Sequence, residues 1–371
     1  MVRTWWSLYS LERTLSIVTG RPSIIVDSCC SVPLPIPVTE EQISDEMEAA
    51  FRMRKGSSTS FVTMSQSWSN GIMDPPRTPV GLGTTEANSG SYFKAAVQLS
   101  IVTQSILTSL YTASTMIRSA AENQHEMAQL DQRLEQWVLS LPKEFNFQGP
   151  PSGAGITFSR ERMLLGFQLC SARMLLGRPC LNPRRQAWKE GSDATFARRM
   201  GNSCIEAAKT IVDFLPDEPS AHFIYDQGPW WCIVHHMMQA VAVLLLGLSY
   251  PASTSQDSML LMHYVKKVIG FLQTMQDSVA ERAYRVAMNS FETVSRRYPV
   301  DVSDLWRLES VQGRGVHPPI DPNIASYIPT QFVQQDGAMA TYATYDAVPT
   351  GATFPAYSAA PAFSENYFVG R

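Results

Sequence analysis

Residues 5–20 read WWSLYSLERTLSIVTG, and this stretch places its apolar side chains at helical spacing. That apolar surface consists of Trp5, Trp6, Leu8, Tyr9, Leu11, Leu15 and Val18. Gly20 and Pro22 predict the end of a helix over residues 4–19, because glycine suits a helix C-cap and proline does not continue a helix. The run VPLPIP at residues 32–37 predicts an extended arm over 20–38.

Only four residues precede Trp5, so this apolar helix needs partners from elsewhere in the protein. We therefore expect the chain to be the C-terminal part of something longer, truncated at its N-terminus. We also expect an incomplete core that exposes apolar surface around Trp5, Trp6 and Tyr9.

Apolar residues that recur every three or four positions predict further helices along most of the chain. The predicted ranges are 40–53, 94–120, 123–140, 160–177, 193–215, 230–250, 257–276 and 278–298. Ser159 is placed to cap the helix that begins at Arg160. No period-2 alternation is long enough to build a sheet, so the predicted fold class is all-α.

Two segments interrupt the helical pattern. Residues 55–92 are rich in Ser, Thr, Gly and Pro and predict a disordered insertion, which is either a loop or translated intron sequence. Residues 312–371 predict a disordered tail rich in aromatic residues, Pro and Ala, which is either an activation segment or a tail without a role. The helical domain is thus predicted over 1–54 and again over 93–311.

Charge and cysteine content restrict the class of protein. The net charge of −3 leaves no overall basic field for nucleic acid, and the local basic clusters are short. The six cysteines include no C-x2-C pair, and no signal peptide is visible. Cys170, Cys204 and Cys232 lie on apolar helical stretches, which indicates reduced core thiols in a cytosolic or nuclear protein.

The segment 230–250 has no Lys, Arg, Asp or Glu and is long enough to cross a bilayer. His235, His236 and Gln239 lie inside it, and no basic flank orients it. These features favour a buried helix of a large helical domain over a membrane span.

Catalytic signatures are missing from the sequence. It has no phosphate-binding glycine loop and no G-x-S-x-G turn. His125 and Glu126 match half of an H-E-x-x-H zinc helix, but Gln129 replaces the second histidine, so an exposed polar face is the better interpretation. We assign no catalytic and no metal-binding residue, and cofactor-binding residues stay unknown.

Cys232 and His235 share a helix face, as metal ligands would, but a structural zinc needs four ligands and no companion pair exists. A hydrogen-bonded histidine in a helical interior is the more ordinary reading. If the apolar helix lines a cavity, then His235, His236 and Trp230 or Trp231 would be its polar and aromatic contacts. Arg21 and Arg178 precede prolines at helix ends, where capping of carbonyls is the expected role.

Four blocks, in order over roughly residues 1–300, carry a family resemblance. They are WWSLYSLER (5–13) with TGRPS (19–23) and VPLP (32–35), LDQRLEQW (130–137) leading to SLP (140–142), RMLLGRPCL (173–181), and GPWW (228–231). Together they resemble the middle homology region of fungal transcription factors, of the xylanolytic-activator type.

The resemblance implies a large helical regulatory domain in a nuclear protein that is not an enzyme. In that family a binuclear zinc cluster with six closely spaced cysteines binds DNA upstream of this region. The chain carries no such cluster, so we expect no cofactor in it, zinc only in a missing N-terminal domain, and DNA contact only through that domain. Homodimer or coactivator contacts and a small-molecule effector stay open as partners, and no membrane is expected.

Two alternative hypotheses belong to other classes. A truncated interaction protein would dimerise with full-length factors or compete against them without binding DNA. An enzyme on a helical scaffold would need an acidic metal-binding cluster such as D-D-x-x-D or a phosphate-binding loop, and the sequence has neither.

Overall fold

The computed structural model describes residues 1–43, 87–112, 115, 117–146, 157–181, 191–248 and 255–296. Within these ranges the chain forms nine α-helices, several 3-10 turns and no strand, which confirms the all-α prediction. The helices are α1 (Val2–Thr19), α4 (Ser89–Leu110), α5 (Ala120–Leu139), α7 (Ser159–Gly177), α8 (Gly191–Asp213), α9 (Ala221–Gln227), α10 (Trp230–Leu248), α11 (Ser255–Thr274) and α12 (Ser278–Ser295).

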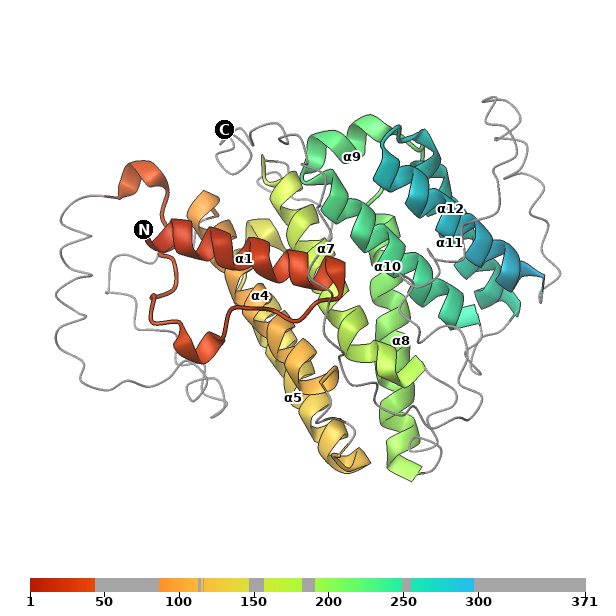
Figure 1. Cartoon of the computed structure of the whole chain (residues 1–371), viewed down its shortest axis with the longest axis horizontal. Helices are drawn as coiled ribbons and strands as arrows, with labels where there is room; N and C mark the ends of the chain where they lie inside the picture. Colours follow the sequence, from red (N-terminus) through yellow and green to blue (C-terminus); the bar gives the residue numbers. More distant parts are fainter. Residues whose placement is uncertain are drawn as a thin grey trace, which may run out of the picture. The chain divides into compact units, whose positions relative to one another are not determined.

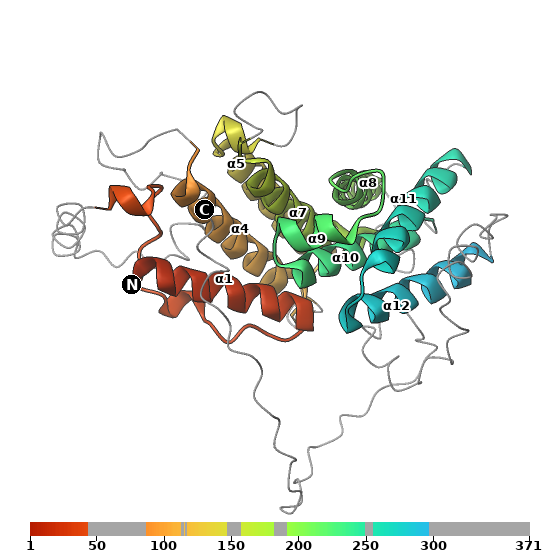
Figure 2. The ribbon, with the colours of Figure 1, turned by 90° about the horizontal axis from the view of Figure 1, so that it is seen from above.

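Helix α7 lies between two groups of helices (Figures 1 and 2). It packs against α4 and α5 on one side and against α8 and α10 on the other. Phe167 and Met174 enter the apolar cluster of α8, α10, α11 and α12, whereas Leu165 and Leu169 enter the cluster of α4 and α5. Because both faces of α7 are buried, this helix joins the two clusters.

Helix α10 is the most apolar helix of the described chain and the one long and apolar enough to cross a membrane by length and composition. It packs against α1, α7, α8, α9, α11 and α12. Over its most apolar 18 residues, 61% are buried inside the protein. This packing favours the interpretation of residues 230–250 as the core helix of a helical domain.

Helix α1 and the arm that follows it form a third, smaller cluster against α4. Gly20 ends α1 in the left-handed conformation, with φ of 65°, as the glycine-proline signal predicts. The arm then returns along α1, and the Trp6 indole N–H donates to the Pro33 carbonyl at 2.7 Å. Trp6 also meets the Tyr9 ring edge-on, with centroids 4.9 Å apart.

The expected exposure of apolar surface around Trp6 and Tyr9 is wrong. Both side chains are fully buried, and Trp5 is partly buried, because the proline-rich arm and α4 cover them. The exposed apolar side chains of this region are instead Leu8 and Leu15 on α1, with Ile24 and Val26 on the arm.

Several helix boundaries differ from the predicted ones. The helix predicted over 94–120 ends at Leu110. The next helix, α5, starts at Ala120, where Ser119 and Glu122 form a capping box. Ser159 is the first helical residue of α7 and Phe158 holds the cap position, so Ser159 does not cap this helix. The short helix α9 carries no sequence signal that we identified.

Part of the predicted disordered insertion is helical. Asn88 caps α4, and Ser89 begins it, so residues 89–92 belong to a helix. The rest of the predicted insertion, most of the predicted helix 40–53 and the whole predicted tail 312–371 lie outside the described residues. Of the helix predicted over 40–53, the structure describes a 3-10 turn at Glu40–Gln42.

The arm reaches α4 where Gly90 allows the two backbones to touch. A Cβ atom at Gly90 would lie 2.0 Å from the Val38 carbonyl oxygen. The Asn88 amide also donates to the Pro37 carbonyl at 3.3 Å. The end of the arm is thus fixed against the first turn of α4.

We predict that Gly90→Ala destabilises the protein by on the order of 1–3 kcal/mol, although glycine to alanine in a helix ordinarily stabilises by about 0.5–1 kcal/mol. The added methyl group would push the arm away from α4. Urea unfolding of both proteins measures the difference. Ser89→Ala, at an exposed neighbouring position, is the control and should change stability little; a stabilising effect of Gly90→Ala would contradict the described contact.

Candidate functional site

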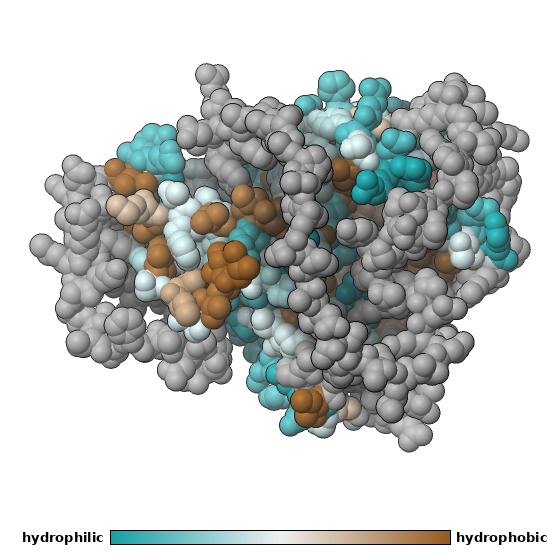
Figure 3. All heavy atoms as spheres, viewed as in Figure 1, coloured by the Kyte–Doolittle hydropathy of each residue, from teal (hydrophilic) through white to brown (hydrophobic). Residues whose placement is uncertain are grey.

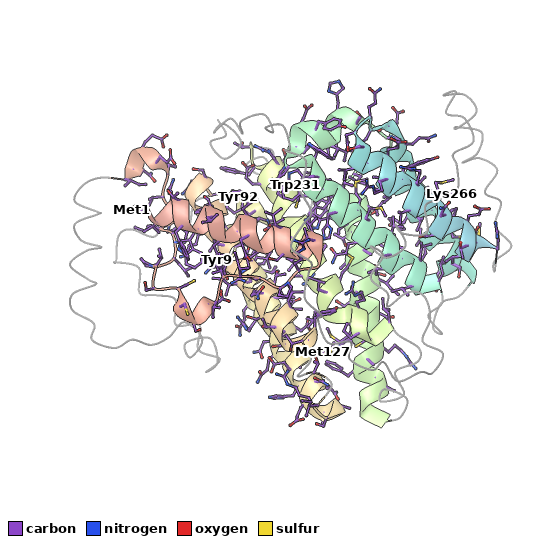
Figure 4. The ribbon with its side chains drawn as sticks, viewed as in Figure 1. Met1, Tyr9, Tyr92, Met127, Trp231 and Lys266 are labelled. Carbon is purple, nitrogen blue, oxygen red and sulfur yellow. The ribbon has the colours of Figure 1, made fainter. Side chains whose placement is uncertain are left out.

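A buried arginine on α1 holds the arm in place. Arg13 is 2% exposed, and its guanidinium donates to Asp27 Oδ1 at 2.5 Å, to the Ile25 carbonyl at 2.9 Å and to the Ser23 hydroxyl. The Tyr9 hydroxyl donates to the same Asp27 oxygen at 2.8 Å. The guanidinium also lies over the Tyr9 ring, 4.5 Å from its centroid. Figure 4 labels Tyr9 on α1, the helix that packs against α4.

Glu12 completes this network from the neighbouring position. Its carboxylate accepts hydrogen bonds from the Ser23 hydroxyl at 2.8 Å and from the Ile24 amide at 2.8 Å, and it lies 3.7 Å from Arg13 Nη1. Burial acts to raise the pKa of Glu12, but the hydrogen bonds from Ile24, Ser23 and Ser16 and the nearby Arg13 charge lower it below its ordinary value. Burial and Asp27 together raise the pKa of Tyr9, so its hydroxyl stays protonated.

A small cavity of about 40 Å³ lies where α1, α4, α7 and α10 meet, and Arg13 forms part of its wall. The residues that line it are Arg13, Thr14, Ile17, Val18, Leu99, Ser100, Thr103, Gln168, Ser171, Cys232, His235 and His236. Three of the hydroxyl groups donate to backbone carbonyls one turn earlier: Thr14 to Ser10, Ser100 to Ala96 and Thr103 to Leu99. Their oxygens retain the capacity to accept.

Four residues of the cavity wall each carry one buried polar atom without a hydrogen-bond partner among the described residues. These atoms are Arg13 Nε, Gln168 Oε1, His235 Nε2 and His236 Nδ1. Buried polar groups in folded proteins are nearly always hydrogen-bonded, so four at one place indicate a site that further molecules complete.

Both histidines of the cavity are neutral at physiological pH. Burial lowers the pKa of His235 to about 4 and that of His236 to about 3, and the neighbouring His235 adds to the second shift. His236 Nε2 lies 3.5 Å from the Cys232 sulfur. Burial raises the pKa of Cys232 to about 12, so this thiol is not a reactive thiolate.

The sequence located part of this cavity. It named His235 and His236 as polar contacts of a cavity along the apolar helix, and both line it. Trp230 and Trp231, the proposed aromatic contacts, do not; the Trp230 ring instead meets Tyr225 at 6.0 Å. The wall residues Arg13 and Gln168 were missed, because a charged or amide side chain within a helical pattern is normally assigned to the exposed face.

The other candidate residues named from the sequence make contacts that give no metal site. Cys232 faces His236 and not His235, and no group of three or more potential metal ligands occurs in the part of the chain that the structure describes. Gln129 contacts His125 at 2.9 Å on the exposed face of α5, as expected. The Arg178 guanidinium lies over the Tyr111 ring at 5.2 Å, and the Arg21 amide donates to the Ser16 carbonyl at the end of α1.

Hydrophobic residues gather on the face of the molecule that carries α1 (Figure 3). Leu8 is 56% exposed and Ile24 is 85% exposed, with Leu15 and Val26 also exposed. These exposed apolar side chains on α1 and the arm make this face more hydrophobic than the charged surface typical of a helical domain.

We predict that Asp27→Asn lowers the free energy of unfolding by about 1–3 kcal/mol, because it leaves the buried Arg13 charge without its main partner. The expected loss is below that for a fully buried pair, since the Asp27 side chain is partly exposed. Urea unfolding at neutral pH measures it. Asp217→Asn, which removes a surface partner of Lys267 at 3.1 Å, should change stability by less than about 0.5 kcal/mol. Equal effects of the two substitutions would contradict the special role of Asp27.

We also predict that stability falls as the pH drops from about 6.5 towards 4. In this window the unfolded histidines bind protons while folded His235 and His236 stay neutral, which costs roughly 2 kcal/mol for each at pH 5. Above the unfolded pKa neither state binds the proton, and the loss disappears. Unfolding midpoints at pH 7.5 and 5 check this, and the double variant His235→Gln, His236→Gln should flatten the profile. An unaltered profile in the double variant would contradict the buried neutral state.

The N-terminal part of the chain matches a known family. Residues 1–139 match the model described as fungal specific transcription factor domain, which covers α1, the arm, α4 and α5. The matched part supplies the Arg13 network and the α1 and α4 walls of the cavity, whereas α7 and α10 lie beyond it.

Two curated proteins are similar to the chain. The transcription regulator galc of Aspergillus niger is 26% identical over 350 residues, covering 82% of this chain and 41% of that protein. An uncharacterized transcriptional regulatory protein of Schizosaccharomyces pombe is 51% identical over 41 residues, or 11% of this chain and 5% of that protein. The chain thus spans less than half the length of either relative. No solved structure matches the chain.

The two relatives are named for transcriptional regulation and not for catalysis. Together, the comparisons show that residues 1–139 match the fungal specific transcription factor domain and that most of the all-α chain is similar to a transcription regulator.

Proposed function

We propose that this chain is the regulatory, middle homology region of a fungal transcription factor and controls DNA-templated transcription without catalysing a reaction. The family match over residues 1–139 carries the proposal, because it covers α1 and the arm that Trp6 and Arg13 hold by hydrogen bonds. The similarity to galc over 82% of the chain extends the same assignment to α7 and the helices that follow.

The whole protein, in this proposal, works in the nucleus and binds DNA through a zinc-cluster domain outside this chain. The chain itself needs no metal for that role, and its cysteines are dispersed thiols, three of them buried. Its partners would be a second copy or coactivators, and a small-molecule effector would act on it from within. No membrane contact is required, because the apolar α10 packs against other helices of the domain.

A second candidate function is an interaction protein that dimerises with full-length factors or competes against them without binding DNA. The exposed apolar side chains Leu8, Leu15, Ile24 and Val26 favour such contacts, because they form a surface that another protein could cover.

A tethering experiment tests the first candidate. The full 371-residue chain is fused to a heterologous DNA-binding domain and placed over a single-copy reporter in a fungal host. We expect reporter transcription to change at least roughly three-fold relative to the DNA-binding domain alone, in either direction. Asp27→Asn should reduce the change through lost stability, whereas Asp217→Asn should preserve it.

A nuclear, well-expressed fusion that leaves the reporter unchanged would contradict the first candidate. If the untethered chain then alters the output of a co-expressed full-length factor, the interaction protein is the better assignment. Fluorescent tagging of the same proteins measures the nuclear location.

A further inference from the structure

The cavity between α1, α4, α7 and α10 brings together polar groups that the helices themselves do not satisfy. Arg13 and His236 are both more than nine-tenths buried, and each has one nitrogen without a partner there. We propose that this cavity is a binding site for a small uncharged molecule that carries hydroxyl groups.

The size of the cavity limits the ligand. One water molecule needs about 10–15 Å³ by the same measure, so about 40 Å³ holds roughly three water-sized groups. That room suits a group of three or four non-hydrogen atoms, such as a vicinal diol. The wall includes partly exposed residues, among them Ser100 and His235, so the rest of a larger molecule can extend towards solvent.

The charges around the cavity favour an uncharged ligand. The Arg13 charge is already balanced by Asp27 at 2.5 Å and Glu12 at 3.7 Å. The wall residues include no Lys, Asp or Glu, and both histidines are neutral. An anion would find no unpaired cation there, and a cation would find no unpaired carboxylate, so either would lose its hydration without compensation.

The hydrogen-bonding groups favour hydroxyls in particular. Arg13 Nε donates and Gln168 Oε1 accepts, while a neutral imidazole offers a donor or an acceptor according to its tautomer. A hydroxyl group both donates and accepts, so a diol can satisfy this mixed set. Thr103 and Ser100 add oxygens that still accept, since their own protons go to backbone carbonyls.

The position of the cavity allows a bound ligand to affect the packing of α1 against the rest of the domain. Arg13 joins the cavity to the arm, and α7 and α10 join it to the two main apolar clusters. A ligand that satisfies Arg13 and the α10 histidines would stabilise the packing of α1 on α10. This regulatory consequence rests on the proposed function, whereas the binding itself does not.

Ligand-observed saturation-transfer NMR on the full chain tests the site with 1,2-ethanediol, using acetate and ethylammonium as charged probes of the same size. We expect saturable binding of the diol, with a dissociation constant roughly in the millimolar range for so small a ligand. Acetate and ethylammonium should bind at least about ten-fold more weakly.

Gln168→Leu should weaken diol binding at least about five-fold by removing the acceptor, and the isosteric Thr103→Val should weaken it about three-fold. Gln129→Leu, the same substitution on the exposed face of α5, is the matched control.

Thermal melts check that each variant folds. If Gln168→Leu does not fold, diol binding by Thr103→Val tests the proposal instead. Absent saturation, equal binding of acetate, or equal binding by Thr103→Val and the wild type would overturn the proposal. Diol binding without any reporter response would leave the site standing and count against regulation by it.

Discussion

The burial of the Arg13 charge is the constraint on which the N-terminal half of this protein depends. A guanidinium that is 2% exposed is tolerated only when its charge and its donors are matched. The arm supplies that match through Ser23, Ile25 and Asp27, which obliges the chain to turn back at Gly20 and run along α1. In this position the arm covers Trp6 and contacts α4 at Gly90. The need to pair the Arg13 charge therefore fixes the arm in a largely apolar interface with α1 and α4.

The C-terminal half follows a different principle, because its core is held almost entirely by apolar packing. Helix α7 contributes to both main apolar clusters, and α10 packs against α1, α7, α8, α9, α11 and α12, so apolar contacts dominate the packing of both helices. Polar residues of α10 meet polar groups of other helices, such as Gln239, which accepts a hydrogen bond from Ser171 of α7 at 2.7 Å. His235 and His236 share the cavity with Arg13, and the two halves of the domain therefore meet at a polar site within an otherwise apolar interior.

Local sequence signals predicted the helices well where periodicity and caps agree, as for α1, which ends at Gly20, and α5, which carries a regular stripe of buried residues. They failed where tertiary contacts decide. Trp6 and Tyr9 looked unpartnered because their cover comes from a proline arm and from Phe93 and Val97 of α4, far along the chain. Likewise, the pairing of a buried arginine with Asp27 depends on the return of the arm, which no local pattern reveals. For the cavity, the histidines stood out within an apolar run, whereas Gln168 did not.

The buried arginine makes α1 and its arm an integral part of the helical domain, and native-state hydrogen exchange is the measurement that tests this integration. Backbone amides of α1 from Tyr9 to Arg13 should exchange as slowly as those in the middle of α7 and α10, because all would open in one cooperative unfolding event. Exchange of the α1 amides that is orders of magnitude faster than that of α7 and α10 would contradict it, since α1 would then open independently of the core.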